Sequence, residues 1–459
     1  MADTADARDE DSYAIDDALW EDLYAAIEAE SETALDRLLE PLHPADIADL
    51  LEQLSAAARA RLLALWSRRI DGDVLSELDE ALREEVIALL PRDVLAGAVR
   101  ELDSDDVVDL VEDLEDAQQE AILATLDQAD RAAVEQSLAY PDNSAGRLMQ
   151  TEVVRAPDFW TVGEAIDYMR ADKRHLPEQF YHIVLVDPRM KPVGYVTLGK
   201  LLASKRRVRL VDITEDSFRP IPATQGQDEV AYAFNQYHLI SAPVIDDDGR
   251  LVGMITIDDA MIVLEEEAEE DILRLAGVSE VSSLSDRVVD TTKQRLPWLG
   301  VNLITSILAS IVIAQFEDAI AQIVALAVLM PIVASMGGNA GTQSLTVAVR
   351  ALATKDLTRS NLMRVVWREG AVGLINGVFF ALVMGVVGYI WFGSAFLGLV
   401  IAVAMVVNLV IAGLAGVLVP VVLDRVGVDP ALASGAFVTT VTDVVGFFAF
   451  LGLAVLILL

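Results

Sequence analysis

The 459-residue sequence contains no cysteine and only four histidines, none of them after residue 238. The absence of cysteine excludes a disulfide framework, a thiolate metal site and a cysteine nucleophile. Basic residues are also scarce, because 34 Lys and Arg stand against 72 Asp and Glu, a net charge of −38. This deficit argues against binding to nucleic acid, since phosphate contacts need a basic surface. The mean hydropathy is nonetheless positive, at +0.41.

The acidic residues and the long apolar runs occupy different parts of the chain. From Thr291 onward there are eight Lys or Arg and seven Asp or Glu, which leaves a net charge of −39 on residues 1–290. The first twenty residues have neither a basic region nor an apolar core, so we expect no signal peptide. This division predicts a multi-domain membrane protein, with acidic cytoplasmic domains followed by a membrane domain.

Five segments in the last third of the chain are long and apolar enough to cross a bilayer as helices. We expect these spans near Trp298–Phe316, Ala319–Met336 with a continuation through the Gly-Asn segment, Ala371–Phe392, Ala395–Leu423 and Ala431–Leu459. The basic flanks, at 293–295 and between the second and third spans, all lie on the side of the N-terminal domains. The positive-inside rule then places the N-terminus in the cytoplasm and the C-terminus outside, in the plasma (inner) membrane.

The soluble part contains two internal repeats. Leu42–Leu54 and Leu102–Leu114 align without a gap, and each has an apolar stripe of helical period that starts near Pro44 or Ser104. They predict an all-α superhelical N domain over residues 1–145. Ile183–Leu201 matches Ala242–Ala260 at an offset of 59 residues, and each copy predicts strand, turn, strand and helix. This α/β pattern resembles tandem CBS domains, which we expect over residues 146–261, with copies at about 146–208 and 209–261.

An acidic helical pattern, Ile262–Val278, follows the CBS pair and meets a stop signal at Gly277. A less regular stretch, Ser279–Pro297, then leads into the first span. We expect the connecting helix and linker over residues 262–292 and the five-helix membrane domain over 293–459. A charge run of this kind is usually a solvated helix face. The alternative is that several domains meet here and repel one another unless divalent cations lie between them.

One carboxylate lies near the middle of a predicted span. Asp443 stands in the last span, where a charged side chain costs roughly 2.5–3.5 kcal/mol on insertion scales, and no Lys, Arg or His is available at that depth. Such a residue usually faces an ion pathway. The alternative is that hydroxyls of Thr439, Thr440 or Thr442 satisfy it and that it serves packing.

The segment Pro331–Arg350 is the second candidate for a pore lining. Its glycines at 337, 338 and 341 allow a broken helix whose carbonyls face a cavity, or else close packing between helices. The predicted oxygen ligands are Asp443, Gly338, Asn339, Thr342 and Gln343. Hard cations such as Mg²⁺ prefer this chemistry, and one carboxylate per chain suits a hydrated ion on a twofold axis between two chains.

Nearly the whole chain resembles the MgtE family of magnesium channels and transporters, through PIVASMGGNAGTQSLTVAVRALA, DPALASGAFVTTVTDVVGFF and EEDILRLAGV. The resemblance implies a homodimer in the lipid bilayer, a Mg²⁺ pore at the dimer interface with Asp443 as its aspartate, and a plug role for the connecting helix. It implies regulatory metal ligands that close the pore when intracellular Mg²⁺ binds, namely Asp105, Asp109, Asp259, Glu267, Glu270 and Asp271.

Ile262 and His238 stand where the family often has acidic residues, and Thr342 where it often has Asn, so the number of regulatory ions stays open. Some CBS pairs of the family resemble ATP-binding ones, and no motif here decides whether this pair binds ATP.

The hypothesis is therefore passive, gated Mg²⁺ uptake, with divalent cations and the bilayer as partners and no nucleic acid. Two alternatives stay open: the same architecture carrying another divalent cation, such as Co²⁺ or Mn²⁺, and a membrane sensor that conducts no ion. An enzyme is disfavoured because the sequence has no nucleophile–base pair, no metal-binding His cluster and no Gly-Lys-[Ser/Thr] phosphate loop.

Overall fold

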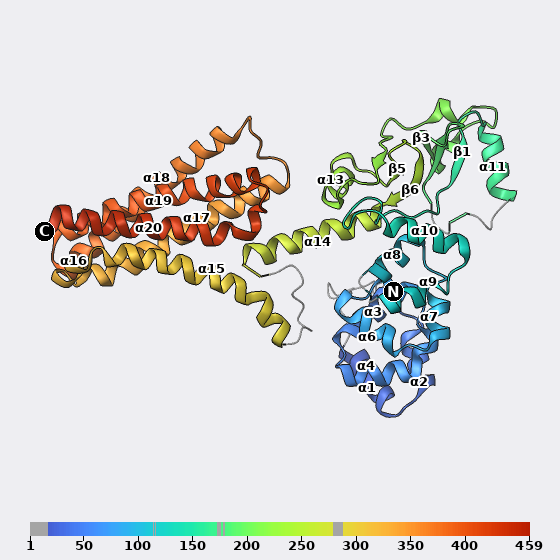
Figure 1. The fold of residues 1–459 in the computed structure, drawn as a ribbon, viewed down its shortest axis with the longest axis horizontal. Helices are drawn as coiled ribbons and strands as arrows, with labels where there is room; N and C mark the ends of the chain where they lie inside the picture. The colour runs from blue at the N-terminus through green and yellow to red at the C-terminus, as the bar shows by residue number, and fades with distance from the viewer. Residues whose placement is uncertain (1–16, 113, 115, 172–175, 178–179, 279–287) are drawn as a thin grey trace, which may run out of the picture. The chain divides into compact units, whose positions relative to one another are not determined.

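The computed structural model describes residues 17–112, 114, 116–171, 176–177, 180–278 and 288–459, with the backbone alone at 17, 80, 81, 116, 290 and 432–434. Residues 1–16, which carry most of the evidence against a signal peptide, lie outside the described part. The chain forms two compact units, Met1–Glu265 and Glu266–Leu459, and each is described here by itself (Figure 1).

The first part of unit Met1–Glu265 is a stack of short helices, as predicted for an all-α domain. They are α1 (Asp17–Glu28), α2 (Glu32–Leu39), α3 (Pro44–Gln53), α4 (Ala56–Trp66), α5 (Gly72–Ser76), α6 (Glu80–Leu89), α7 (Arg92–Ala98), α8 (Ser104–Glu112), α9 (Asp116–Leu123) and α10 (Gln128–Leu138), with a 3₁₀ turn at Ser67–Arg69. The repeated helices α3 and α8 begin at Pro44 and Ser104, as the sequence predicts. Pro44 suits the first turn because its missing N–H has no helical partner there, and His43 and Asp46 form a capping box around it.

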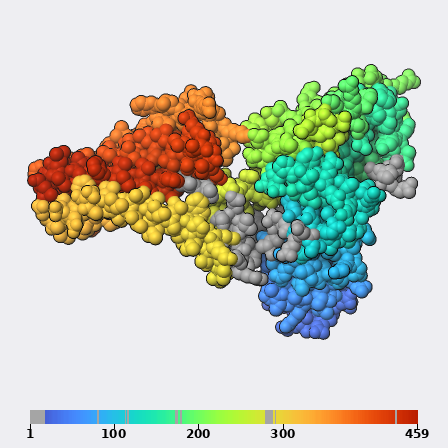
Figure 2. Space-filling model, viewed as in Figure 1, coloured from blue at the N-terminus to red at the C-terminus, as the bar shows by residue number. Residues whose placement is uncertain are grey.

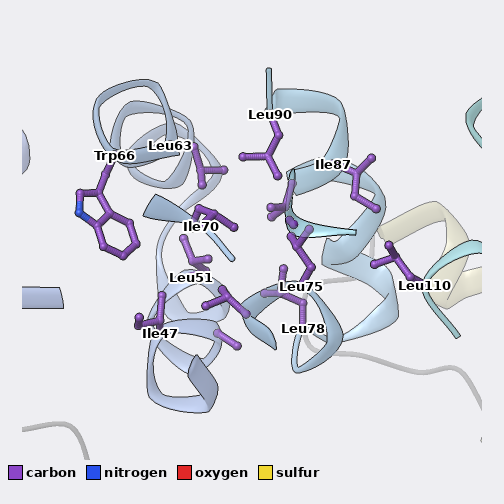
Figure 3. Packing of buried hydrophobic residues seen from close by; sticks show 14 of the residues in the cluster. Ile47, Leu51, Leu63, Trp66, Ile70, Leu75, Leu78, Ile87, Leu90 and Leu110 are labelled. Carbon is purple, nitrogen blue, oxygen red and sulfur yellow. The ribbon is translucent and has the colours of Figure 1, made fainter. Parts of the chain in front are cut away.

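The apolar stripes of these helices converge on one continuous core. Figure 3 shows Leu51, Leu63 and Leu75 pointing toward one another, with Trp66 at one side of the cluster. Trp66 satisfies its indole N–H through Asp36 Oδ1 at 3.0 Å, so its burial leaves no unpaired donor. Helices of five to twelve residues are marginal alone, and this shared core holds them in place.

The CBS pair consists of two three-stranded sheets of the same topology. The first has β1 (Arg155–Pro157), β2 (His182–Val186), β3 (Pro192–Thr197), α11 (Val162–Ala171), α12 (Leu198–Ala203) and a 3₁₀ turn at Leu210–Ile213; the second has β4 (Ile221–Pro222), β5 (Ser241–Ile245), β6 (Leu251–Thr256) and α13 (Gln227–Tyr237). In each sheet the middle strand is parallel to the first and antiparallel to the third. Strands β2 and β3 correspond to β5 and β6 at the predicted offset of 59 residues. Each middle strand also has a shift of its pairing register near its end.

The two copies meet through equivalent positions. His182, the first residue of β2, contacts Ser241, the first residue of β5, with 2.6 Å between His182 Nδ1 and Ser241 Oγ. At the turn of each hairpin the backbone takes positive φ, at Met190 in the first copy and at Gly249 in the second. Glycine adopts this region without strain, whereas Met190 does so only because the surrounding fold holds it.

The predicted acidic connector is part of a longer helix, α14 (Ile257–Leu275). It begins directly after β6, five residues before the expected start, so Asp258 and Asp259 form its first turn. It ends as predicted: Gly277 takes φ of +73°, and the N–H of Val278 donates to the carbonyl of Leu273. Residues 279–287 of the predicted irregular linker lie outside the described part, and from Val288 the chain is already helical.

Unit Glu266–Leu459 contains five helices that are long and apolar enough to cross a membrane, within the described residues. Its helices are α15 (Val288–Ala314), α16 (Glu317–Gln322), α17 (Ala325–Ala353), α18 (Leu362–Phe392), α19 (Ala395–Arg425) and α20 (Pro430–Leu458). Helix α19 is the central one, packed by α17, α18 and α20, and the yellow α15 lies along the red α20 (Figures 1 and 2). The second span starts at Ala325 and not at Ala319, because the short α16 precedes it, and the third starts nine residues earlier than expected.

Of the two alternatives for the glycines of Pro331–Arg350, the structure shows close helix packing and not a broken helix. Helix α17 runs without interruption from Ala325 to Ala353, and its glycines allow close packing instead. A Cβ at Gly337 would collide with Asn408 Nδ2 of α19, and one at Gly341 would lie 2.6 Å from Val438 of α20. Gly338 differs, since a Cβ there meets nothing within 4 Å.

This difference predicts that Gly337→Ala destabilises the protein while Gly338→Ala does not. The new methyl at position 337 collides with the buried Asn408 amide, and overpacking of this kind costs about 1–3 kcal/mol. Thermal unfolding of the full chain in detergent measures the effect. Equal melting temperatures for both variants would show that α17 and α19 are not packed as described.

Candidate ion pathway and regulatory carboxylates

Asp443 lies near the middle of α20 and is partly exposed in the single chain. Among the described residues, no side chain donates a hydrogen bond or forms an ion pair with its carboxylate. The neighbouring hydroxyls are engaged elsewhere, because Thr440 Oγ1 donates to the carbonyl of Ala436 and Thr442 Oγ1 to that of Thr439. The packing alternative, in which these hydroxyls satisfy Asp443, therefore has no support from Thr440 or Thr442.

The side chains predicted to accompany Asp443 form an exposed polar stripe on α17. Asn339, Thr342 and Gln343 are all exposed, and Ser335 and Thr346 extend the stripe by one turn at each end. The opposite face of α17 holds Gly337, Gly341, Ser344 and Leu345, which are buried against α19 and α20. The hydroxyls of Thr342 and Thr346 donate to carbonyls four residues earlier in the same helix. Asn339 and Gln343 thus keep carbonyl oxygens available on a surface at the depth of a bilayer.

A buried amide that the sequence prediction missed holds the three central helices together. Asn408 of α19 is fully buried, its Nδ2 donates to the carbonyl of Val333 at 2.8 Å, and its Oδ1 has no protein partner. It lies between Gly337 of α17 and Gly446 of α20, each too close to accept a Cβ. A lone Asn in an apolar run was the available signal, since polar residues inside a span pack inward.

A second carboxylate inside the helical bundle was also missed. Glu369 precedes the predicted third span, Ala371–Phe392, but it lies within α18 and accepts a hydrogen bond of 2.9 Å from Ser344 Oγ of α17. Unlike Asp443 it has a donor from its own chain. We therefore assign Glu369 to helix packing.

The C-terminal half of α14 contacts the end of the bundle through an ion-pair network. Arg274 bridges Glu270 of its own helix and Asp429, which also caps α20 by accepting from the N–H of Ala431. Leu275 packs with a cluster formed by Leu345 and Val349 of α17 and by Ala431 and Val438 of α20, with Val419 of α19 beside it. This contact lies wholly inside unit Glu266–Leu459.

The predicted regulatory residues of this helix are distinguished from their neighbours by burial. Glu267, Glu270 and Asp271 are half-buried, whereas Glu265 and Glu269 are exposed. Burial raises the pKa of Asp271, and the nearby negative charges of Asp429 and Glu267 raise it further. Glu270 has its counter-charge in Arg274, so the electrostatic cost falls on Asp271.

A separate acidic cluster in unit Met1–Glu265 joins the helical domain to the start of α14. Asp105 and Asp106 of α8 both feel the charge of Asp259, whose Oδ2 accepts a hydrogen bond of 2.7 Å from Thr256 Oγ1. Burial and this repulsion raise the pKa of Asp105 well above its usual range and that of Asp106 to about 7; burial chiefly raises that of Asp259 to about 6. Asp106 was missed because on sequence it is one of several acids in a row.

Asp109, one turn after Asp105, has a different environment. Its Oδ2 pairs with Arg83 Nη1 at 2.8 Å, and the buried Arg83 also donates to the carbonyls of Ser76, Leu78 and Asp109. The structure thus places Asp105 close to Asp259 and gives Asp109 a guanidinium partner. Ile262 and His238, the departures from the family pattern, are both exposed.

The oxygen ligands of the candidate ion pathway and of the two acidic clusters fit a hydrated hard cation better than a dehydrated one. All are carboxylate, amide or hydroxyl oxygens, and within the described ranges no three Asp, Glu or His side chains converge closely enough to hold a metal ion alone. Mg²⁺ usually keeps several waters and binds through one or two carboxylates. The uncompensated charge at Asp105, Asp106 and Asp259 is of the sign and chemistry that such an ion neutralises.

These features define a multi-domain membrane protein with a helical domain, a CBS pair and a five-helix membrane domain that carries an unpaired carboxylate. The MgtE model, described as a divalent cation transporter, matches residues 330–453; the MgtE intracellular N domain matches 42–143, and the CBS domain matches 145–206 and 211–266. The chain belongs to the MgtE family.

Relatives of similar length support this assignment. The magnesium transporter MgtE of Thermus thermophilus is 33% identical over 444 residues, which cover 95% of this chain and 98% of the relative. That of Bacillus subtilis is 30% identical over 357 residues, 78% of this chain and 79% of the relative. Among solved structures, the cytosolic domain of the Mg²⁺ channel MgtE in complex with ATP is 30% identical and covers 53% of this chain and 99% of that one, with a TM-score of 0.49.

The raised pKa of Asp106 predicts a pH-dependent stability in the absence of divalent cations. Because the folded state binds a proton that the unfolded state releases, the free energy of unfolding falls as pH rises from about 4 toward 7. Asp106→Asn should flatten this fall, while the exposed Asp93→Asn should not. Hydrogen exchange of the α8 peptide at several pH values, in chelator, measures it. A profile for Asp106→Asn that follows the wild type would contradict the burial of this carboxyl.

Proposed function

We propose that the protein is a Mg²⁺-selective channel or transporter through which Mg²⁺ enters the cell passively. The observation that carries the proposal is the Asp443 carboxylate, placed mid-helix in α20 with no bonding partner among the described residues. The magnesium transporters named above, from the same family, support Mg²⁺ as the transported ion. A dication crossing 100 mV gains about 4.6 kcal/mol, so no nucleotide-driven motor is required.

The pore in this proposal lies between two copies of the chain. The polar stripe of α17 and the Asp443 carboxylate are exposed in one chain, and polar groups at bilayer depth need protein or water to cover them. A twofold dimer places two Asp443 side chains on one axis, enough to hold a hydrated ion together with the amide oxygens of Asn339 and Gln343. Gly338 and Thr342, the remaining predicted pore ligands, belong to the same segment of α17.

The orientation follows from the basic residues. The α17–α18 junction and the start of α15 hold seven Lys or Arg, and the positive-inside rule assigns this side to the cytoplasm. The helical and CBS domains are then cytoplasmic and the C-terminus of α20 is outside, in the plasma membrane.

Gating is proposed to depend on intracellular Mg²⁺. At low Mg²⁺, the negative charges of Asp105, Asp259, Glu267 and Asp271 repel neighbouring carboxylates, and at high Mg²⁺ bound ions hold the closed state. Asp109 and Glu270, predicted for the same role, each have an arginine partner and contribute less in this proposal. ATP binding by the CBS pair stays a prediction without a motif.

Asp443→Asn should abolish Mg²⁺ flux into liposomes while the protein still folds. The substitution keeps the size of the side chain and removes the charge that attracts the dication. Glu317→Gln, at the exposed first residue of α16, is the matched control. Dye-reported flux of Mg²⁺, Co²⁺ and Mn²⁺ at two internal Mg²⁺ levels distinguishes the magnesium channel from its alternatives. Wild-type flux by Asp443→Asn would reject the assignment, and no flux by the wild type would favour the non-conducting sensor.

Glu267→Gln with Asp271→Asn should leave Mg²⁺ conduction intact but weaken closure by internal Mg²⁺. Both side chains are half-buried in the C-terminal half of α14, and the charge of Glu267 raises the pKa of Asp271, so the pair gains from a bound dication. The control, Glu265→Gln with Glu269→Gln, removes the same charge from exposed positions of the same helix. The measurement is the internal Mg²⁺ concentration that halves the flux. An equal shift in both double variants would reduce the effect to net charge and remove the sensor role.

A further inference from the structure

A hollow of about 500 Å³ opens at one end of the membrane unit, where α17 and α19 finish and α18 begins. Its lining combines an apolar wall, Leu352, Leu362 and Val421, with the charged side chains of Arg359, Asp424 and Arg425. No predicted pore or regulatory residue lines it. Apolar and charged groups in one concave site are typical of sites for amphipathic ligands.

The segment that carries Arg359 is held by its own hydrogen bonds. Leu357 is buried and its N–H donates to the carbonyl of Ala351 at 2.7 Å. The Asn361 side chain accepts from the N–H of Thr358 at 2.8 Å and donates to the carbonyl of Asp356 at 2.7 Å. These bonds give the loop a defined conformation and fix the backbone that presents Arg359 to the hollow.

The side chains of the two arginines of the hollow have no bonded partner in the described part of the chain. Neither Arg359 nor Arg425 forms an ion pair or hydrogen bond with another described residue, although Asp424 lies in the same lining. Two guanidinium groups and one carboxylate leave one net positive charge. The ligand that complements this lining carries one negative charge, and guanidinium groups bind phosphate oxygens particularly well.

The surroundings indicate where such a ligand comes from. Met363, Trp367 and Val422 flank the hollow in sequence and are each more than half exposed. Exposed apolar side chains on a membrane helix face acyl chains, and Trp is enriched at the headgroup level. Basic pockets between membrane helices on the cytoplasmic side bind lipid headgroups.

We propose that this hollow binds one anionic phospholipid of the cytoplasmic leaflet, with its phosphate between Arg359 and Arg425. An acyl chain lies against Leu352, Leu362 and Val421, and Asp424 accepts hydrogen bonds from headgroup hydroxyls. Phosphatidylglycerol, with one negative charge and two hydroxyls, fits this lining. The site uses the membrane orientation of the proposed function but not its ion selectivity, so failure of one leaves the other standing.

The test is native mass spectrometry of the full chain released from nanodiscs with equal amounts of phosphatidylglycerol and phosphatidylcholine of identical acyl chains. The wild type should retain phosphatidylglycerol selectively. Arg359→Gln with Arg425→Gln should reduce this preference by about fivefold for each arginine removed. Arg364→Gln with Arg368→Gln, which removes equal charge from exposed positions outside the lining, should reduce it less than about twofold.

A second variant separates the hollow from general electrostatic attraction. Leu352→Trp fills the cavity without changing charge and should also lower phosphatidylglycerol retention. If the double arginine variant does not fold, the single variants Arg359→Gln and Arg425→Gln, together with Leu352→Trp, test the site. Equal losses in the control, full retention by Leu352→Trp, or no lipid preference in the wild type would overturn the site. Displacement of the lipid by inorganic phosphate would assign the hollow to a soluble anion and overturn it as well.

Discussion

The desolvation of carboxylates is the constraint on which this structure depends. A carboxylate withdrawn from water needs a counter-charge or hydrogen-bond donors, and the chain supplies them at some of its buried acids but not at others. Asp109 has Arg83, Glu270 and Asp429 share Arg274, and Glu369 has Ser344. Asp443 has no partner within the described chain, and Asp105, Asp106 and Asp259 have one another as neighbours. This contrast separates acids that stabilise the fold from the acids to which the proposed function assigns a cation.

The same contrast explains why the cation expected at these sites is hydrated and hard. Imidazole and thiolate ligands are absent from the membrane unit by composition, and three converging carboxylates are absent from the part of the chain that the structure describes. What is present is isolated negative charge with nearby amide and hydroxyl oxygens. Such a set attracts a dication without stripping its water shell, and the weak hold permits release as well as entry. The polar stripe of α17 fits this role without a break in the helix, because side chains and not backbone carbonyls are presented.

Much of the fold could be predicted from the sequence, because its elements repeat or follow local rules. The offset of 59 residues placed β2 and β3 on β5 and β6, Pro44 and Ser104 marked the starts of α3 and α8, and apolar length predicted the five long helices. What failed depended on contacts between distant residues. The glycines of α17 could break a helix or pack one, and only the position of Asn408, whose amide bonds Val333 75 residues away in sequence, decides for packing. Asp109 pairs with Arg83, 26 residues away in sequence, so no local pattern could show that this predicted regulatory acid already has a counter-charge.

Helix α14 gives the proposed gating a physical route. Its first turn carries Asp259, which repels Asp105 and Asp106 within the first unit, and its last turn carries Arg274 and Leu275, which contact the membrane helices within the second. Under the proposed gating, this single α-helix of 19 residues is the element through which relief of repulsion at its first turn acts on the contact at its last turn. The ion pairs of Arg274 hold the contact between α14 and the membrane helices without a bound cation. In the proposed gating, cations therefore need only bind the closed state more tightly than the open state. Under the proposed gating, the Arg274 ion pairs favour the closed state, and the mutually repelling carboxylates make its formation depend on Mg²⁺.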